Sequence, residues 1–321
     1  MIIKNIINFS FSILLVVIVA GCAKEEKKEL KIAISPWPGY EPIVLALHKG
    51  FFGDMKVRIV RYPTPKESFR AFRDGEVDIA AFTTNEMIHY AKVKDTPKIF
   101  LIMDISNGGD ALFSQADIKS IDDLKGKKIG LAPSELGEYL INRALDFSDN
   151  ISREDVTLVA VEFEKQIELF TNKEIDAIAT YNPNKALLLT QNANNLFDSS
   201  KIPYEIVDVL VTSDEILKQR KEDLIVLKNA WFKAVDYISK NEEETMQIMA
   251  EYEGISVSEF ESGFKELLIP SSQENRKMFN DTNSSLYIGV KKMYKQMSSK
   301  EQITKNIDIN KLFISSIVNA E

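Results

Sequence analysis

The chain has 321 residues, 45% of them hydrophobic, and a net charge of −8 from 40 Lys and Arg against 48 Asp and Glu. This length exceeds what one small core organises and predicts two lobes or domains. The acidic balance argues against nucleic acid as a partner, because a basic face supplies most of the affinity for phosphates, and favours a soluble protein that binds small molecules.

The N-terminal residues have the features of an export signal. The run FSILLVVIVA is too short to cross a bilayer as a helix, which needs about 20 apolar residues, and has the length of a signal-peptide core. It ends in Val19-Ala20-Gly21-Cys22, which resembles the lipobox of bacterial lipoproteins. We therefore predict a signal peptide over 1–21, a lipid on Cys22 and a charged tether over 22–29. The alternative is a short buried segment that ends in an incidental Cys.

Three sequence blocks occur twice, in the same order and at nearly the same spacing, which indicates an internal repeat. The pairs are KIAISP from Lys31 with KKIGLAP from Lys128 (128 − 31 = 97), VRIVRY from Val57 with VTLVAV from Val156 (156 − 57 = 99), and FRDGEVDIAAFTTN from Phe72 with FTNKEIDAIATYNP from Phe170 (170 − 72 = 98). Each block reads as a short apolar strand, so each half of the repeat is predicted to contain the same strands.

The elements expected in chain order alternate between strand and helix. Continuous β-branched runs are typical of parallel strands that are buried on both faces, and the alternation indicates a doubly wound α/β lobe in each half. The predicted strands are 30–35, 57–62, 79–83, 128–132, 156–161 and 177–181, and the predicted helices are 42–49, 66–73, 135–147 and 165–172.

After Thr212 the apolar spacing becomes helical, so we expect a helical C-terminal part that packs on the first lobe. Segments near Asp110 and Asp208 are the candidates for a two-segment hinge between the lobes. The predicted fold is therefore α/β and bilobal. Its predicted parts are the first lobe over 30–110, the second lobe over 111–210 and the return to the first lobe over 211–321.

A ligand site is expected where strands end. In open α/β sheets, ligands bind beyond the carboxyl ends of the strands. The loops there offer aromatic faces for stacking or for a cation, neutral hydrogen-bonding groups and carboxylates, but no Lys or Arg. This favours a neutral, zwitterionic or amine-bearing ligand. The candidate ligand-binding residues are Trp37, Gly39, Tyr40, Thr83, Thr84, Asn85, Asp104, Asn107, Asp110, Ser134, Glu135, Tyr181 and Asn182.

Each of these residues also has a structural interpretation. Trp37 can simply wedge the turn between strand and helix, and Asp104 and Asp110 can cap turns, as Asp commonly does. His48 and His89 fall in helical segments far apart in sequence, which favours satisfied or exposed side chains over metal binding. No metal site and no cofactor are predicted.

With these residues in hand, the chain resembles the type II periplasmic substrate-binding proteins of the nitrate/sulfonate/taurine and thiamine-pyrimidine-precursor group. The resemblance is carried by ISPWPGYEPIVLALHKGFF, FRDGEVDIAAFTTNEMI, DIKSIDDLKGKKIGLAPSELGEYLINRAL and ELFTNKEIDAIATYNP, and by EIVDVLVTSDEIL followed by KNAWFKAVDYISKN. It implies a cleft that closes by hinge motion, a membrane-embedded ABC permease as partner, a monomer, and lipid anchoring on the periplasmic face of a membrane. The lack of basic loop residues argues against nitrate and simple sulfonates.

Two rival functions stay open at this point. The same superfamily contains a pyrimidine synthase of similar fold, but that activity is associated with a Cys-rich tract and this chain has one Cys. We therefore predict that the protein is not an enzyme. The second rival is a receptor that presents its ligand-bound form to a membrane sensor kinase. The sequence does not separate this role from import, because both need only a closing bilobal binder.

Overall fold

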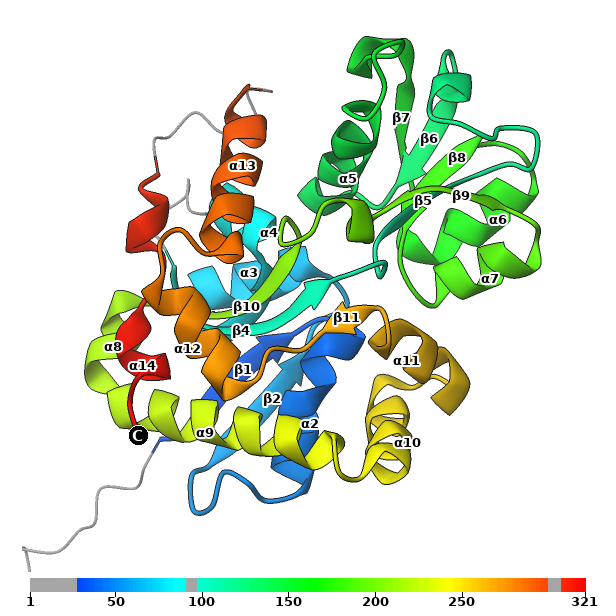
Figure 1. Ribbon diagram of the computed structural model, residues 1–321. Helices are drawn as coiled ribbons and strands as arrows, with labels where there is room; N and C mark the ends of the chain where they lie inside the picture. Colours follow the sequence, from blue (N-terminus) through cyan, green and yellow to red (C-terminus); the bar gives the residue numbers. More distant parts are fainter. Residues whose placement is uncertain (1–27, 91–96, 300–306) are drawn as a thin grey trace, which may run out of the picture.

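Two separate β-sheets, each covered by helices on both faces, organise the two lobes of the protein (Figure 1). The computed structural model describes residues 28–90, 97–299 and 307–321. The predicted signal peptide and Cys22 lie outside these residues. Among the helices in the described ranges, none combines the length and the hydrophobicity that crossing a bilayer requires.

The sheet of the first lobe has the strand order β11-β4-β10-β3-β1-β2. Strands β1, β2 and β3 run parallel, as their apolar sequences predict, whereas β10 lies antiparallel between β3 and β4. The strands are β1 (Leu30–Ile34), β2 (Val57–Arg61), β3 (Ile79–Thr83), β4 (Lys98–Ser106), β10 (Val207–Thr212) and β11 (Leu267–Leu268).

The sheet of the second lobe repeats this arrangement, with the order β7-β6-β8-β5-β9. The parallel strands β7, β6 and β8 correspond to β2, β1 and β3, and the antiparallel β5 takes the place that β10 has in the first sheet. The internal repeat is thereby confirmed. The strands are β5 (Ala111–Ser114), β6 (Lys128–Leu131), β7 (Thr157–Ala160), β8 (Ala177–Thr180) and β9 (Asn194–Asp198).

Two chain segments, 107–110 and 199–206, connect the sheets. The sequence predicts crossings near Asp110 and Asp208. The observed ones lie slightly earlier in the chain, because the residues that follow them form the strands β5 and β10. Ser199 ties the crossings together: its hydroxyl bonds to Ser106 Oγ (2.8 Å) and accepts from the Gly108 N–H (2.7 Å), and its own N–H donates to the Asp110 carbonyl (2.9 Å). The two connections therefore form one joint.

Helices follow the strands close to where the sequence predicts them. Helix α3 shows the local reason: Pro65 starts it, and the Thr64 hydroxyl accepts from the Glu67 N–H as an N-cap. The helices of this part are α2 (Glu41–His48), α3 (Pro65–Arg73), α4 (Thr84–Tyr90), α5 (Glu135–Leu145), α6 (Gln166–Thr171) and α7 (Asn184–Thr190). Helices α4 and α5 also contact each other, across the two lobes.

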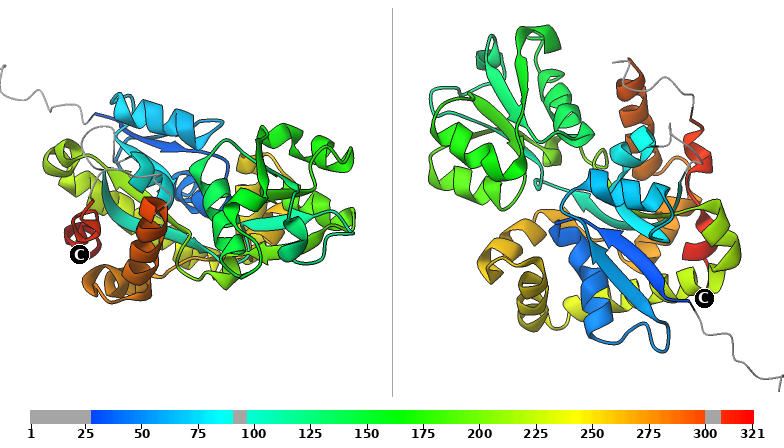
Figure 2. Two further views of the ribbon diagram at one scale, coloured as in Figure 1. Left: turned by 90° about the horizontal axis from the view of Figure 1, so that it is seen from above. Right: turned by 180° about the vertical axis from the view of Figure 1, so that it is seen from behind.

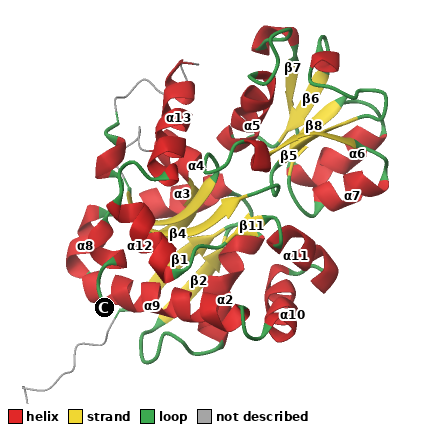
Figure 3. Ribbon diagram, in the orientation of Figure 1, coloured by secondary structure: helices red, strands yellow, loops and turns green. Residues whose placement is uncertain are grey.

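The C-terminal helices pack on the first lobe, as predicted (Figures 2 and 3). Helices α9 and α10 lie against α2, and α14 lies against α9 and β4; the indole of Trp231 on α9 is fully buried in this contact layer. The helices are α8 (Asp214–Gln219), α9 (Lys221–Ile238), α10 (Glu242–Glu253), α11 (Val257–Phe264), α12 (Ser272–Asn280), α13 (Ser285–Ser299) and α14 (Ser315–Val318).

Candidate functional site

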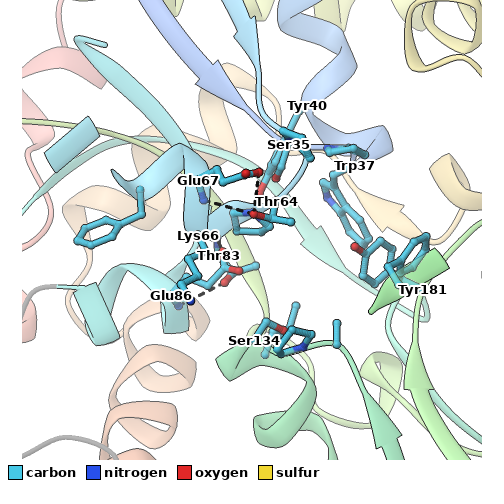
Figure 4. A pocket seen from close by; sticks show the side chains of 18 of the residues that line it. Ser35, Trp37, Tyr40, Thr64, Lys66, Glu67, Thr83, Glu86, Ser134 and Tyr181 are labelled. Carbon is cyan, nitrogen blue, oxygen red and sulfur yellow. Dashed lines mark hydrogen bonds between the residues drawn. The ribbon is translucent and has the colours of Figure 1, made fainter. Parts of the chain in front are cut away.

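A cavity of about 1100 Å³ lies between the lobes and is lined by both of them. The first lobe contributes the turn after β1, the loop between β2 and α3, and the start of α4, and the second contributes the loops that follow β6, β7 and β8. Figure 4 shows Ser134 and Tyr181 facing Trp37, Tyr40 and Thr83 across this space. The cavity therefore sits at the carboxyl ends of the parallel strands of both sheets, as the strand-end rule predicts.

Aromatic side chains from both lobes meet in the cavity. The rings of Trp37 and Tyr181 contact edge to face, with centroids 5.7 Å apart and an interplanar angle of 77°. Phe163 stacks on Tyr181 at 4.7 Å and 22°. Edge-to-face and offset-stacked pairs are the favoured aromatic geometries. The three rings and Tyr40 line the cavity and offer apolar and π surface to a ligand.

Trp37 has a structural contact as well as a place in the cavity. Its Nε1 donates to both carboxylate oxygens of Asp104, at 3.3 and 3.2 Å, and its side chain is 9% exposed. Gly39 makes room for this contact, because a Cβ at this position would come within 1.9 Å of Asp104 Oδ2. Trp37 therefore both packs against Asp104 and lines the cavity. Its contact with a ligand stays a prediction.

Asp104 and Asp208 form a buried acid pair beneath the cavity. They are directly opposite in the β4–β10 ladder, and the Tyr40 hydroxyl donates to Asp208 Oδ1 at 2.5 Å. Burial raises the pKa of Asp104 to about 7, against the hydrogen bond from Trp37. Burial and the neighbouring Asp104 also raise the pKa of Asp208 well above its ordinary value. The pair therefore holds a proton at neutral pH.

Charge is unevenly distributed over the cavity lining. The buried lining residues include three carboxylates, on Glu86, Asp110 and Asp208, and no Lys or Arg. The lining residues Lys66, Arg70 and Arg73 are exposed and all lie on α3. The loops named from the sequence contain no Lys or Arg, but α3, which follows β2, brings three basic residues to the exposed rim of the cavity. The same strand-end rule, applied to the loop after β2, would have placed the predicted helix 66–73 beside the site.

The second lobe contributes mainly neutral groups, and some are already engaged. Asn182 lines the cavity, but its Nδ2 donates to Glu266 Oε2 (3.3 Å) and its Oδ1 accepts from the Ala186 N–H (3.2 Å). Lys185, on α7, donates from Nζ to Glu266 Oε1 (2.5 Å) and to the Gly108 carbonyl (2.6 Å). These contacts connect the second lobe to the segment between α11 and β11.

The structure brings about half of the predicted site residues to the cavity. Those that line it are Trp37, Tyr40, Thr83, Asp110, Ser134, Tyr181 and Asn182. Five others lie nearby without lining it: Asp104 behind Trp37, Gly39 in the turn, Thr84 and Asn85 buried at the start of α4, and Asn107 in the first crossing. Glu135 is the first residue of α5. The lining residues that the sequence interpretation missed include Ser35, Thr64, Lys66, Arg70, Phe163, Asp208 and Glu253.

Some of the missed residues could have been identified from the sequence, and others could not. Thr64 and Phe163 follow predicted strands and could have been found by extending the strand-end rule to every loop. Asp208 gave no such signal, because it lies inside a strand and reaches the cavity only through its place between β3 and β4. In residues 28–90, 97–299 and 307–321, no group of three or more His, Cys, Asp or Glu could hold a metal ion.

Comparison with known proteins places this geometry in context. A putative thiamine biosynthesis protein of Haemophilus influenzae is 26% identical over 262 residues, which cover 78% of this chain and 81% of that protein. The alkanesulfonate-binding protein SsuA from Xanthomonas axonopodis pv. citri, bound to MOPS, superposes with a TM-score of 0.71 at 14% identity over 89% of this chain and 98% of its own.

A further solved structure, the ligand-binding component of an ABC-type import system from Staphylococcus aureus with zinc bound, superposes with a TM-score of 0.74 at 13% identity. The match covers 91% of this chain and 98% of that chain. The fold is thus that of the bilobal periplasmic binding proteins. Residues 37–245, more than half of the chain, match the family described as NMT1/THI5 like, and the chain belongs to this family.

Proposed function

We propose that the protein is the extracytoplasmic solute-binding component of an ABC importer. It captures a small nitrogen- or sulfur-containing organic molecule, which is neutral, zwitterionic or amine-bearing, and delivers it to a membrane-embedded permease. The observation that carries the proposal is a cavity of about 1100 Å³ lined by both lobes, which are joined by two short crossings. A bilobal protein of this kind closes on its solute by hinge motion.

The size and lining of the cavity support a small organic solute. Pockets for small molecules typically measure about 300–1,000 Å³ and combine apolar walls with a few polar groups. This cavity is just above that range and has aromatic rings beside buried carboxylates. The fold of the relatives supports solute binding as the role. The ligand of this chain is inferred from its own cavity.

Export and anchoring complete the proposal. The N-terminal sequence ends in Ala20-Gly21-Cys22 and is followed by the charged residues of the tether, so we place the protein on the periplasmic face of a membrane, held by a lipid on Cys22. Replacing Cys22→Ser is expected to move the protein from the membrane fraction to the soluble fraction without unfolding it. A variant protein that still sediments with membranes would contradict the anchor.

A thermal-shift screen of small amines, pyrimidines, sulfonates and nitrate tests the binding role. A solute that binds only the folded protein raises its melting temperature by mass action, and calorimetry of each hit then gives a stoichiometry of one per chain. The variant Tyr181→Ala should weaken binding of the hit. Phe147→Ala is the matched control, because Phe147 is an exposed aromatic residue of the same lobe (56% exposed) that does not line the cavity. Equal loss in both variants, or no saturable solute, would refute the proposal.

A further inference from the structure

Three carboxylate oxygens of the cavity lining are buried without a hydrogen-bond partner among the described residues. They are Asp110 Oδ2, Asp208 Oδ2 and Glu253 Oε2. Asp110 and Asp208 are 3% and 1% exposed. A buried polar atom without a partner costs about 1–3 kcal/mol, and a charged one costs more. The lining of the cavity therefore presents hydrogen-bond acceptors that lack donors from the described residues.

The groups around these oxygens supply few of the missing donors. Tyr40 donates to the other oxygen of Asp208. Asp104 adds like charge, and the two carboxyl groups share a hydrogen bond through the proton that the pair holds. Lys185 acts on Asp110 from a distance, but its ammonium already bonds Glu266 and the Gly108 carbonyl, and Glu266 opposes its effect. Glu86 adds a further carboxylate to the buried lining. No described Lys or Arg directly pairs with Asp110 or Asp208 in the ion pairs and hydrogen bonds of the site.

The aromatic residues beside the carboxylates favour the same ligand chemistry. Trp37, Tyr40 and Tyr181 line the cavity together with Asp110 and Asp208. Ring faces attract cations, with an energy of about 0.5–2 kcal/mol that increases as water is removed. The exposed cations of the lining, on α3, lie outside this buried part.

Building on the proposed function, we propose that the solute carries a protonated nitrogen, and that this nitrogen docks on Asp110 and Asp208 at the buried end of the cavity. The N–H groups of an ammonium or amidinium ion supply the donor that Asp110 Oδ2 lacks and replace the proton that Asp208 shares with Asp104. The apolar part of the solute then lies along Trp37 and Tyr181. An amine ligand of ordinary basicity, with a pKa near about 10, arrives charged at neutral pH.

Binding of a cationic solute should release protons from the protein, whereas binding of a neutral or anionic solute should not. Burial raises the pKa of Asp110 to about 6 and that of Asp104 to about 7, and the pKa of Asp208 is also raised. A cation beside these groups stabilises their ionised forms and lowers their pKa. Binding should therefore expel protons held by the empty protein, and affinity for the cation should rise as the pH increases toward about 7.

Three probes of one shape and different charge test the inference: tyramine (a cation), tyrosol (neutral) and 4-hydroxyphenylacetate (an anion). We expect tyramine to bind the full-length wild-type protein at least about tenfold more tightly than the other two. Calorimetry of tyramine in buffers of different ionisation enthalpy should report proton release. Asp110→Asn and Asp208→Asn should each weaken tyramine by about tenfold or more and tyrosol by less than about threefold.

Glu164→Gln is the matched control, because Glu164 is an exposed carboxylate of the same lining, and its effect on tyramine should stay under about twofold. The inference fails if tyrosol or 4-hydroxyphenylacetate binds as tightly as tyramine, or if none of the three binds at about 10 mM while a solute from the screen does. In these cases the solute-binding role stands. If no solute binds at all, the proposed function fails with it.

Discussion

The two lobes share one strand order but contribute differently to the cavity between them. Strands β2-β1-β3 and β7-β6-β8 are arranged alike, yet the buried carboxylates of the lining belong to the first lobe and the adjoining crossing, on Glu86, Asp208 and Asp110. Ser134 of the second lobe stands where the repeat has Trp37 in the first. The inner strands β1, β3 and β8 are constrained by burial on both faces, whereas the loops that follow them are free to diverge.

This difference assigns the lobes different parts in binding. The first lobe holds charge and an indole fixed by a buried hydrogen bond, so its surface is organised before a solute arrives. The second lobe adds neutral and half-buried groups such as Tyr181 and Ser134. We therefore expect substitutions in the first lobe to have larger effects than matched substitutions in the second, and the following experiments test this ranking.

The largest effect is expected for Trp37→Ala. Truncating a buried Trp costs about 3–5 kcal/mol of stability, and here it also removes the donor to both oxygens of Asp104. Binding of the solute should weaken more than about tenfold, because an anchoring aromatic residue is lost. Calorimetry and denaturant unfolding measure the two effects. Trp37→Phe keeps a ring and should retain more affinity than Ala; equal loss in both would show that the ring itself contributes nothing.

The next effect concerns the pH dependence of stability. Carboxylates whose pKa is raised on folding bind protons that the unfolded chain has lost, so the stability of the empty protein should fall as pH rises. The window runs from about 4 to about 7 for Asp104 and to about 8 for Glu253. Asp208→Asn keeps an oxygen for Tyr40 and removes a charge, so it should raise the melting temperature on the alkaline side by on the order of a few degrees. Unchanged pH profiles would refute the buried acid pair.

A smaller effect is expected for Tyr181→Ala on the second lobe. Tyr181 is half-buried and contacts Trp37 and Phe163 through its ring. Aromatic pairs contribute about 0.5–1.5 kcal/mol beyond their burial, so the affinity for the solute should fall about three- to tenfold. Calorimetry beside Trp37→Ala gives the comparison directly. A larger loss for Tyr181→Ala than for Trp37→Ala would reverse the assignment of the lobes.

The smallest effect is expected at the rim, for Arg70→Ala. Arg70 lines the cavity from α3 but is exposed, and exposed charges contribute about 0–1 kcal/mol and are screened by salt. The affinity for an amine solute should change by less than about twofold at physiological salt. Titrations at low and high salt measure this. A loss as large as that of Asp208→Asn would move the binding determinant from the buried part to the rim.

The framework could be predicted from sequence, and the acid pair could not. The six parallel strands show themselves as repeated apolar blocks, and the start of α3 shows itself in Thr64-Pro65, because local burial and capping leave local patterns. Asp104 and Asp208 are about a hundred residues apart, and only the antiparallel pairing of β10 with β4 places them opposite each other. The segment around Asp208 is predicted from sequence as part of the hinge between the lobes, and its sequence does not reveal this partner.

The hydrogen bonds of Ser199 between the two crossings affect how one lobe would rotate against the other. The bonds that Ser199 makes to Ser106, Gly108 and Asp110 keep both connections together beside the acidic end of the cavity. A rotation of one lobe against the other about these connections would displace Asp110 little, because Asp110 lies in one of them. A solute would then contact Asp110 first and be enclosed by the lobes afterwards. On release, the lobes would open first and the contact with Asp110 would be lost last.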